Sequence, residues 1–202
     1  AGSDVVALNL GRVDEDAYPD ALVGAGSGES VLFNNGDGTL GEGRDFATGV
    51  SPSAVAVGDV NGDQVPDLTV ANSDPSANSV SILLGNGSGG FGAKTDFPVG
   101  ARPIGVVLAD FDHNGALDLA TANQDANTIS VLLGDGRGSF GPKHDFSAGS
   151  YPSSMASGIW AVKGVSARAR WQKPWMVKIE ASSKVARASS SRATMSSVCR
   201  AR

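Results

Sequence analysis

The sequence predicts an all-β protein built from about three repeated units, each a four-stranded antiparallel sheet. A short acidic loop recurs, so that Asp20, Asp67 and Asp118 hold the same place in three copies, 47 and 51 residues apart. Short runs of β-branched and aliphatic residues are bounded by Gly, Asn and Asp, which is typical of strands. Residues 1–155 show no long amphipathic helical pattern, and the 202-residue chain holds 27 glycines, which suit tight turns.

Each unit begins with an apolar strand, an acidic loop and a second strand. A polar turn, a third strand, a Gly-rich turn and a shorter fourth strand follow. We expect strands at 4–10, 20–25, 30–34 and 44–47 in the first unit (about 1–49), at 53–58, 67–72, 79–84 and 94–99 in the second (50–100), and at 103–109, 118–123, 128–133 and 143–148 in the third (101–150).

The turns and one very apolar strand support this division. Gly-rich turns such as 35–38 and 134–136 supply residues that tolerate positive φ, as tight hairpins require. The run IGVVLA at 104–109 is apolar almost throughout, as expected for a strand buried on both faces. Four antiparallel strands in about 50 residues make one blade of a β-propeller, so the sequence predicts about three blades, a partial propeller.

The acidic loops carry the clearest chemical signal. DVNGDQVPD (59–67) and DFDHNGALD (110–118) place oxygen-bearing side chains at loop positions one, three, five and nine. Calcium takes six to eight oxygen ligands at about 2.3 to 2.6 Å, and a tight loop with acids at alternate positions points several of them inward. The predicted side-chain ligands are Asp59, Asn61, Asp63 and Asp67 in one loop, and Asp110, Asp112, Asn114 and Asp118 in the other. Capping of turns by these side chains is the alternative interpretation.

The loops, the Phe-Gly steps at 91–92 and 140–141 and the recurring Asp-Phe pairs at 45–46, 96–97 and 145–146 resemble FG-GAP/VCBS repeats. These repeats are the blades of integrin-α-type β-propellers and of many secreted bacterial proteins. The resemblance covers residues 1–155 and implies calcium as cofactor, with the carbonyls of Val65 and Ala116 as further ligands. It also implies a closed ring of seven blades, and we therefore expect this chain to be part of a longer product.

The first loop, RVDEDAYPD (12–20), departs from the pattern because Arg12 replaces the first acid. A guanidinium group cannot bind a cation, and it could replace the metal by pairing with Asp14 or Asp20. We therefore expect a degenerate metal site here, formed by Asp14, Asp16, the Tyr18 carbonyl and Asp20.

Residues 156–202 have a different character. This Ser/Ala/Arg-rich segment holds 10 of the 16 Lys and Arg residues and one of the 21 acids, and the acidic loop of a fourth copy does not follow. Three interpretations stay open: translation out of frame, a poorly ordered extension, or a basic tail that binds an anionic partner.

Composition also limits the function. The acidic repeat region speaks against nucleic acid as its partner, and no run of about 18 apolar residues predicts a membrane span. The two histidines, His113 and His144, have no Ser or Cys in a nucleophile context, so we expect no catalysis. We therefore expect a non-catalytic, calcium-binding segment of a secreted or cell-surface protein that mediates adhesion to an extracellular protein or glycan. The alternative is a fragment of a secreted enzyme, such as a polysaccharide-degrading one, whose catalytic residues lie outside this chain.

Overall fold

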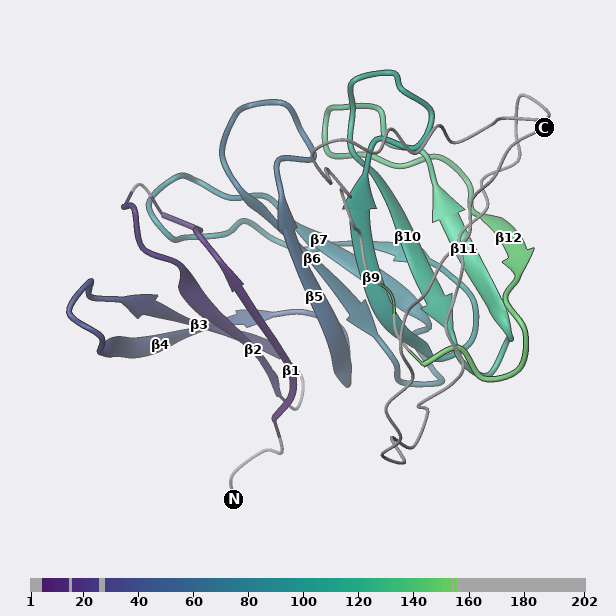
Figure 1. Ribbon diagram of the computed structural model, residues 1–202, viewed down its shortest axis with the longest axis horizontal. Helices are drawn as coiled ribbons and strands as arrows, with labels where there is room; N and C mark the ends of the chain where they lie inside the picture. The colour runs from purple at the N-terminus through teal and green to yellow at the C-terminus, as the bar shows by residue number, and fades with distance from the viewer. Residues whose placement is uncertain (1–4, 15, 26–27, 154, 156–202) are drawn as a thin grey trace, which may run out of the picture.

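The computed structural model describes residues 5–14, 16–25, 28–153 and 155, and it confirms the predicted all-β partial propeller. Three four-stranded antiparallel sheets follow one another from left to right in Figure 1, and they do not close into a ring. The strands of the first blade are β1 (Val5–Gly11), β2 (Asp20–Ala25), β3 (Gly28–Asn34) and β4 (Leu40–Ala47); those of the second are β5 (Pro52–Gly58), β6 (Asp67–Asn72), β7 (Ser79–Leu83) and β8 (Thr95–Pro98); those of the third are β9 (Pro103–Ala109), β10 (Asp118–Asn123), β11 (Thr128–Leu132) and β12 (His144–Ser147).

The largest difference from the predicted strands lies in the first blade. β4 begins at Leu40, four residues before the predicted start, because a tight turn returns the chain at once: the Asn35 amide donates to the Thr39 carbonyl at 3.1 Å, and Leu40 pairs with Asn34. In the second and third blades, longer Gly-rich turns precede the shorter strands β8 and β12. Residues 156–202, the predicted tail, lie outside the described residues.

The pairing register makes the three blades directly comparable. Gly11 pairs with Asp20, Gly58 with Asp67 and Ala109 with Asp118, so each second strand begins on the last loop aspartate. Because the side-chain period of a strand is two, every later position of the three sheets can be matched residue by residue.

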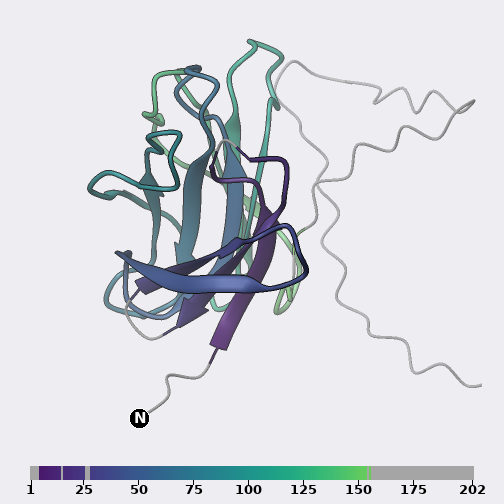
Figure 2. The same cartoon turned by 90° about the vertical axis from the view of Figure 1, so that its left-hand side faces the viewer.

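Apolar side chains fill the spaces between blades. One cluster joins Val31 of the first blade to Leu68 and Val70 of the second, and another joins Val80 and Ile82 of the second to Leu119 of the third. The T-shaped ring pairs Phe46–Phe91 and Phe97–Phe140 lie at the same two joints. Figure 2 shows the molecule with the first blade toward the viewer. The first and third blades therefore each share a core with the second, and the third blade has a further cluster of its own around Ile129.

The chain passes between blades by the same turn each time. Ser51, Arg102 and Tyr151 each precede a proline and take positive φ of 57°, 54° and 51°. The Arg102 amide donates to Asn78 Oδ1 at 2.8 Å, and the Tyr151 amide donates to Asn127 Oδ1 at 2.7 Å. After the third sheet the chain therefore turns as it does before β5 and β9.

Candidate metal centres

The three acidic loops connect the first and second strands of the three blades. The last loop aspartate, Asp20, Asp67 or Asp118, is fully buried and opens the second strand. Asp67 accepts hydrogen bonds from the amides of Val60 at 2.9 Å and Gly85 at 2.8 Å. Equivalent bonds join Asp20 to the amides of Val13 and Asn34, and Asp118 to those of Phe111 and Gly134, at 2.7 to 3.0 Å. The ninth-position carboxylate thus ties its loop to the end of the third strand, where the turn to the fourth strand begins.

The other loop acids bind amides of their own loop. Asp59 accepts from the amides of Gly62 and Gln64 at 2.7 and 2.8 Å, and Asp110 accepts from those of Asn114 and Gly115 at 3.1 and 3.0 Å. Asp63 Oδ1 accepts from the Val65 amide, Asn114 Oδ1 from the Ala116 amide and Asp16 Oδ1 from the Tyr18 amide, at 2.7 to 2.8 Å. These bonds fix the backbone of each loop around its own acidic side chains.

Carboxylate oxygens converge in two of the three loops. One oxygen each from Asp110, Asp112 and Asp118 lie within 4.8 Å of one another, and the same holds for Asp14, Asp16 and Asp20. Among the described residues, Asp59, Asp63 and Asp67 do not form such a group; in that loop Asn61 Nδ2 donates to Asp63 Oδ2 at 2.9 Å. The geometry fits a cation most directly in the third loop, where three acids and the Asn114 amide oxygen are available.

The grouping of acids has an electrostatic cost. Burial raises the pKa of Asp118 and of Asp67, and the nearby Asp112 in one loop and Asp63 and Asp59 in the other raise it further. Burial also raises the pKa of Asp14, with Asp20 and Asp16 adding to the effect. A divalent cation among these groups would remove both penalties, because it offsets the lost hydration and the mutual repulsion.

The turn geometry explains the different glycine placement in the two intact loops. Loop position four is left-handed at Gly62 (φ 80°) and His113 (φ 62°), and position six is left-handed at Gln64 (φ 69°) and Gly115 (φ 91°). Each loop therefore places glycine at one of two left-handed positions and accepts a side chain at the other. The second loop turns at Gly62 and at Gln64.

In the first loop, Arg12 does not replace a metal. Arg12 is exposed and forms no ion pair with Asp14 or Asp20 within the described residues. The physical reason is that Asp20 already accepts two backbone amides and lies in the interior, where a solvated guanidinium would lose its water. The three acids of this loop converge without the first-position acid.

The loops also belong to the joints between blades. The Gly138 amide of the third blade donates to the Val60 carbonyl in the second loop at 3.0 Å, and Val60 is buried in the core between these blades. A Cβ on Gly62 would lie 3.3 Å from the Gly136 carbonyl oxygen. Ordering of this loop therefore also orders the contact with the next blade.

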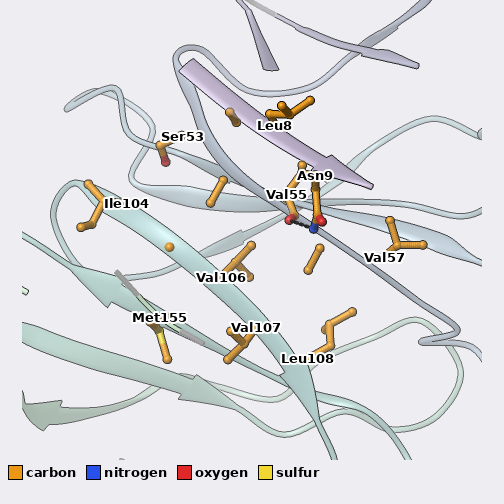
Figure 3. Close-up of a pocket in the computed structure, with 14 residues that line it drawn as sticks. Leu8, Asn9, Ser53, Val55, Val57, Ile104, Val106, Val107, Leu108 and Met155 are labelled. Atoms are coloured by element: carbon orange, nitrogen blue, oxygen red, sulfur yellow. Dashed lines mark hydrogen bonds between the residues drawn. The ribbon is translucent and has the colours of Figure 1, made fainter. Parts of the chain in front are cut away.

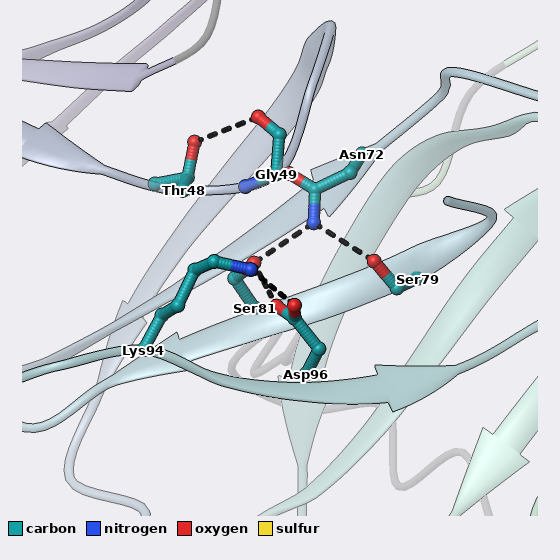
Figure 4. Close-up of polar contacts among 7 residues, drawn as sticks. All are labelled: Thr48, Gly49, Asn72, Ser79, Ser81, Lys94 and Asp96. Carbon is teal, nitrogen blue, oxygen red and sulfur yellow. Dashed lines mark hydrogen bonds and ion pairs between the residues drawn. The ribbon is translucent and has the colours of Figure 1, made fainter. Parts of the chain in front are cut away.

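A buried amide network was missed by sequence reasoning (Figure 4). Asn72, at the end of β6, accepts from the Gly49 amide at 3.1 Å and donates to Ser79 Oγ and Ser81 Oγ at 3.2 and 2.9 Å. Ser81 Oγ donates in turn to Asp96 at 2.6 Å, and Lys94 pairs with Asp96. A similar network surrounds Asn123: it donates to Thr128 and Ser130, Ser130 accepts from the Gly100 amide and donates to Asp145, and Lys143 pairs with Asp145. The signal was an Asn in the same phase of the second and third copies.

The innermost strands β1, β5 and β9 line a groove of about 600 Å³ (Figure 3). Most of the side chains that line it are aliphatic, but polar atoms contribute more of its surface than apolar atoms do. Asn9 Nδ2 donates to the Val55 carbonyl across the joint between the first two blades at 2.7 Å. The two histidines lie apart from this groove, one in the third acidic loop and one on β12. In the described part of the chain, no helix is long and apolar enough to span a membrane.

Two solved structures are similar to part of this chain. The structure of a lectin from Agrocybe aegerita, described as recognising non-reducing terminal N-acetylglucosamine, has 22% identity and a TM-score of 0.50 over 67% of this chain. The Photorhabdus luminescens Tc holotoxin pore has 22% identity and a TM-score of 0.42 over 69% of this chain. The matched parts are 36% of the lectin chain and 7% of the toxin chain, so this chain spans about a third of the lectin. No curated protein shows a significant sequence match.

The family comparison is more specific. The model of the FG-GAP-like repeat matches residues 12–70 and again residues 59–121. Together the two matches cover more than half of the chain and include all three acidic loops. The chain belongs to the FG-GAP-like repeat family.

Proposed function

We propose that this chain is a non-catalytic propeller segment of a secreted or cell-surface protein, which calcium stabilises and which binds an extracellular glycan or protein. The observation that carries the calcium proposal is the convergence of Asp110, Asp112 and Asp118 within 4.8 Å in a repeat whose loop pattern recurs in the second blade. The predicted ligands are the residues named above, with the carbonyls of Val65 and Ala116 completing the two intact sites.

Calcium suits these loops better than magnesium. The loops offer carboxylate, amide and carbonyl oxygens from a flexible ring, whereas magnesium demands near-ideal octahedral geometry and keeps its waters. The three carboxylates of each intact loop more than balance the charge of a divalent cation. Because the second loop also touches the third blade through Gly138, bound calcium would stiffen a joint as well as a loop.

The binding proposal rests on the family and the fold. FG-GAP-type blades present their loops at the two ends of the sheets, where variation in sequence leaves the cores intact. The lectin is similar in fold alone, and its glycan recognition supports a glycan as the first class of ligand to test.

A thermal unfolding series with calcium, magnesium or EDTA tests the metal. We expect calcium to raise the Tm, with about 2.7 kcal/mol of stabilisation when calcium is a hundredfold above its Kd. Asp110→Asn should reduce the rise, whereas the control Asp135→Asn, an exposed turn acid of the same blade, should keep it. An identical Tm in calcium and EDTA would overturn the calcium sites.

Ligand binding is tested by a glycan array that includes terminal N-acetylglucosamine, probed in calcium and in EDTA. We expect retention on a defined set of glycans that EDTA weakens. If the protein is retained on no glycan, the glycan proposal fails. Cross-linking to cell-surface proteins then tests whether the ligand is a protein. Turnover of a polysaccharide by the protein would contradict the non-catalytic assignment.

A further inference from the structure

Glu29 on β3 is a carboxyl group placed in an apolar joint. Its side chain is fully buried, and neither Oε1 nor Oε2 has a hydrogen-bond partner in the part of the chain that the structure describes. Glu29 pairs with Phe46 on β4, just as Val80 pairs with Phe97 and Ile129 with Phe146. The first blade therefore has an acid where the other two have an aliphatic core residue.

The surroundings of Glu29 are adapted to its length. Gly24 lies opposite Glu29 on β2, whereas the buried residues Ala71 and Ala122 lie opposite Val80 and Ile129. A Cβ on Gly24 would lie 3.1 Å from Glu29 Oε2 and 3.2 Å from the Pro52 Cβ. Because Pro52 opens β5, the carboxyl group lies where the first blade meets the second.

Among the residues that the structure describes, no charged group compensates Glu29. The described residues of β1 and β5 carry no charge, and Asp20 at the start of β2 is bound by the amides of Val13 and Asn34. The charged residues of the other neighbouring segments are engaged elsewhere or lie outside hydrogen-bond reach of Glu29. They are Glu42, Arg44 above the Phe33 ring at 4.8 Å, Asp45 bonded to Ser30, Asp67 bonded to the amides of Val60 and Gly85, and Lys94, which precedes β8 and pairs with Asp96.

We propose that the charge of Glu29 controls how firmly the first blade packs on the second: the neutral acid fits the joint, and the carboxylate weakens it. Burial, with no opposing interaction, raises the pKa of Glu29 from 4.5 to about 7. The folded protein therefore holds a proton that the unfolded chain releases between these two values. Stability contributed by this group falls as the pH rises from about 4.5 to about 7, and it is constant above that window.

Thermal unfolding of the full chain across this pH window, at saturating calcium, tests the proposal. We expect the Tm of the wild type to fall by several degrees, whereas Glu29→Gln, which cannot ionise, should lose this part of the fall. The variant Glu29→Val introduces the residue found at this position in the second blade and leaves Gly24 in place, because a Cβ there would lie 2.9 Å from the Ala7 Cβ; it should show the same flat profile. An equal fall in wild type and both variants would overturn the proposal.

Two local measurements separate the joint from a general effect of pH. The carboxyl ¹³C signal of Glu29, assigned by its loss in Glu29→Gln, should titrate near 7. Opening free energies from amide hydrogen exchange, corrected for the intrinsic pH dependence of exchange, should fall in β1–β4 with rising pH more than in β9–β12. A Glu29 signal that titrates near 4.5, or an equal fall in all three blades, would contradict the proposal.

Discussion

The first blade forms the same four-stranded sheet as the second and third with a different set of polar side chains. It has Ala25 where the others have the buried amides of Asn72 and Asn123, and Arg12 where they have Asp59 and Asp110. Three polar features recur in every blade: the Ser–Asp pair between the third and fourth strands, the buried ninth-position aspartate, and the loop bond from the seventh-position amide to the fifth-position side chain. A blade is therefore defined by the pairing register of its apolar strands and by its loop-closing aspartate. The other polar networks add stability to particular joints.

The largest expected effect comes from removing a joint network that the first blade lacks. Asn72→Ala leaves the Gly49 amide without its acceptor in a buried site and should lower the free energy of unfolding by about 3 kcal/mol. Urea denaturation measures this. The exposed Asn86→Ala, also within the second blade, should cost far less, and equal losses would show that the network carries no special stability.

Equivalent strand positions with unequal burial give the next test. Leu8 and Val55 occupy the same register position, paired with Val23 and Val70, but Leu8 is 69% exposed and Val55 is 7% exposed. Val55→Ala should cost about 2 kcal/mol and Leu8→Ala no more than about 0.5 kcal/mol by urea denaturation. A similar cost at Leu8 would mean that this face of the first blade is covered in solution.

Restoring an acid at the first position of the first loop tests why this loop differs from the other two. Arg12→Asp gives the first loop the pattern of the other two. The free energy by which calcium stabilises the protein should therefore grow by about 1 kcal/mol, seen as a larger rise in Tm. In EDTA the same variant should be less stable than the wild type, because four carboxylates then repel one another. Calorimetric titration should show an additional binding event, and Arg12→Lys, which keeps the positive charge, should not.

The smallest effect concerns the left-handed turn positions. Gln64→Gly and His113→Gly remove the strain that a side chain causes at positive φ. After the entropy cost of glycine in the unfolded chain is subtracted, each should stabilise the protein by about 0.5 kcal/mol. Gly115→Ala should cost about 1 kcal/mol, although nothing lies within 4 Å of the added Cβ. Differential scanning calorimetry resolves these changes, and a destabilised Gln64→Gly would mean that the Gln side chain stabilises its loop.

Sequence reasoning located the blades well because their signals are local. Eleven of the twelve predicted strands begin within two residues of the observed start, and β4 differs because its tight turn at 35–39 lets pairing begin early. The acidic pattern of the loops could also be read from spacing, but the second bonding role of Asp67 could not. That role depends on the Gly85 amide, which lies 18 residues away and approaches only when β7 has paired with β6.

The repeat, the turn positions and the acidic loops follow from the amino-acid sequence alone, because period, glycine placement and alternate acids are properties of short segments. Which polar groups meet at the joints between blades depends on how the blades pack. Glu29 is an ordinary acid in its own strand, and it becomes a buried, unpartnered group only when β2 and β5 close around it. Arg12 and Asp20 are close in the sequence, yet the backbone amides of Val13 and Asn34 reach the carboxylate instead. Burial and competition for hydrogen bonds depend on every neighbouring element, and no short segment contains that information.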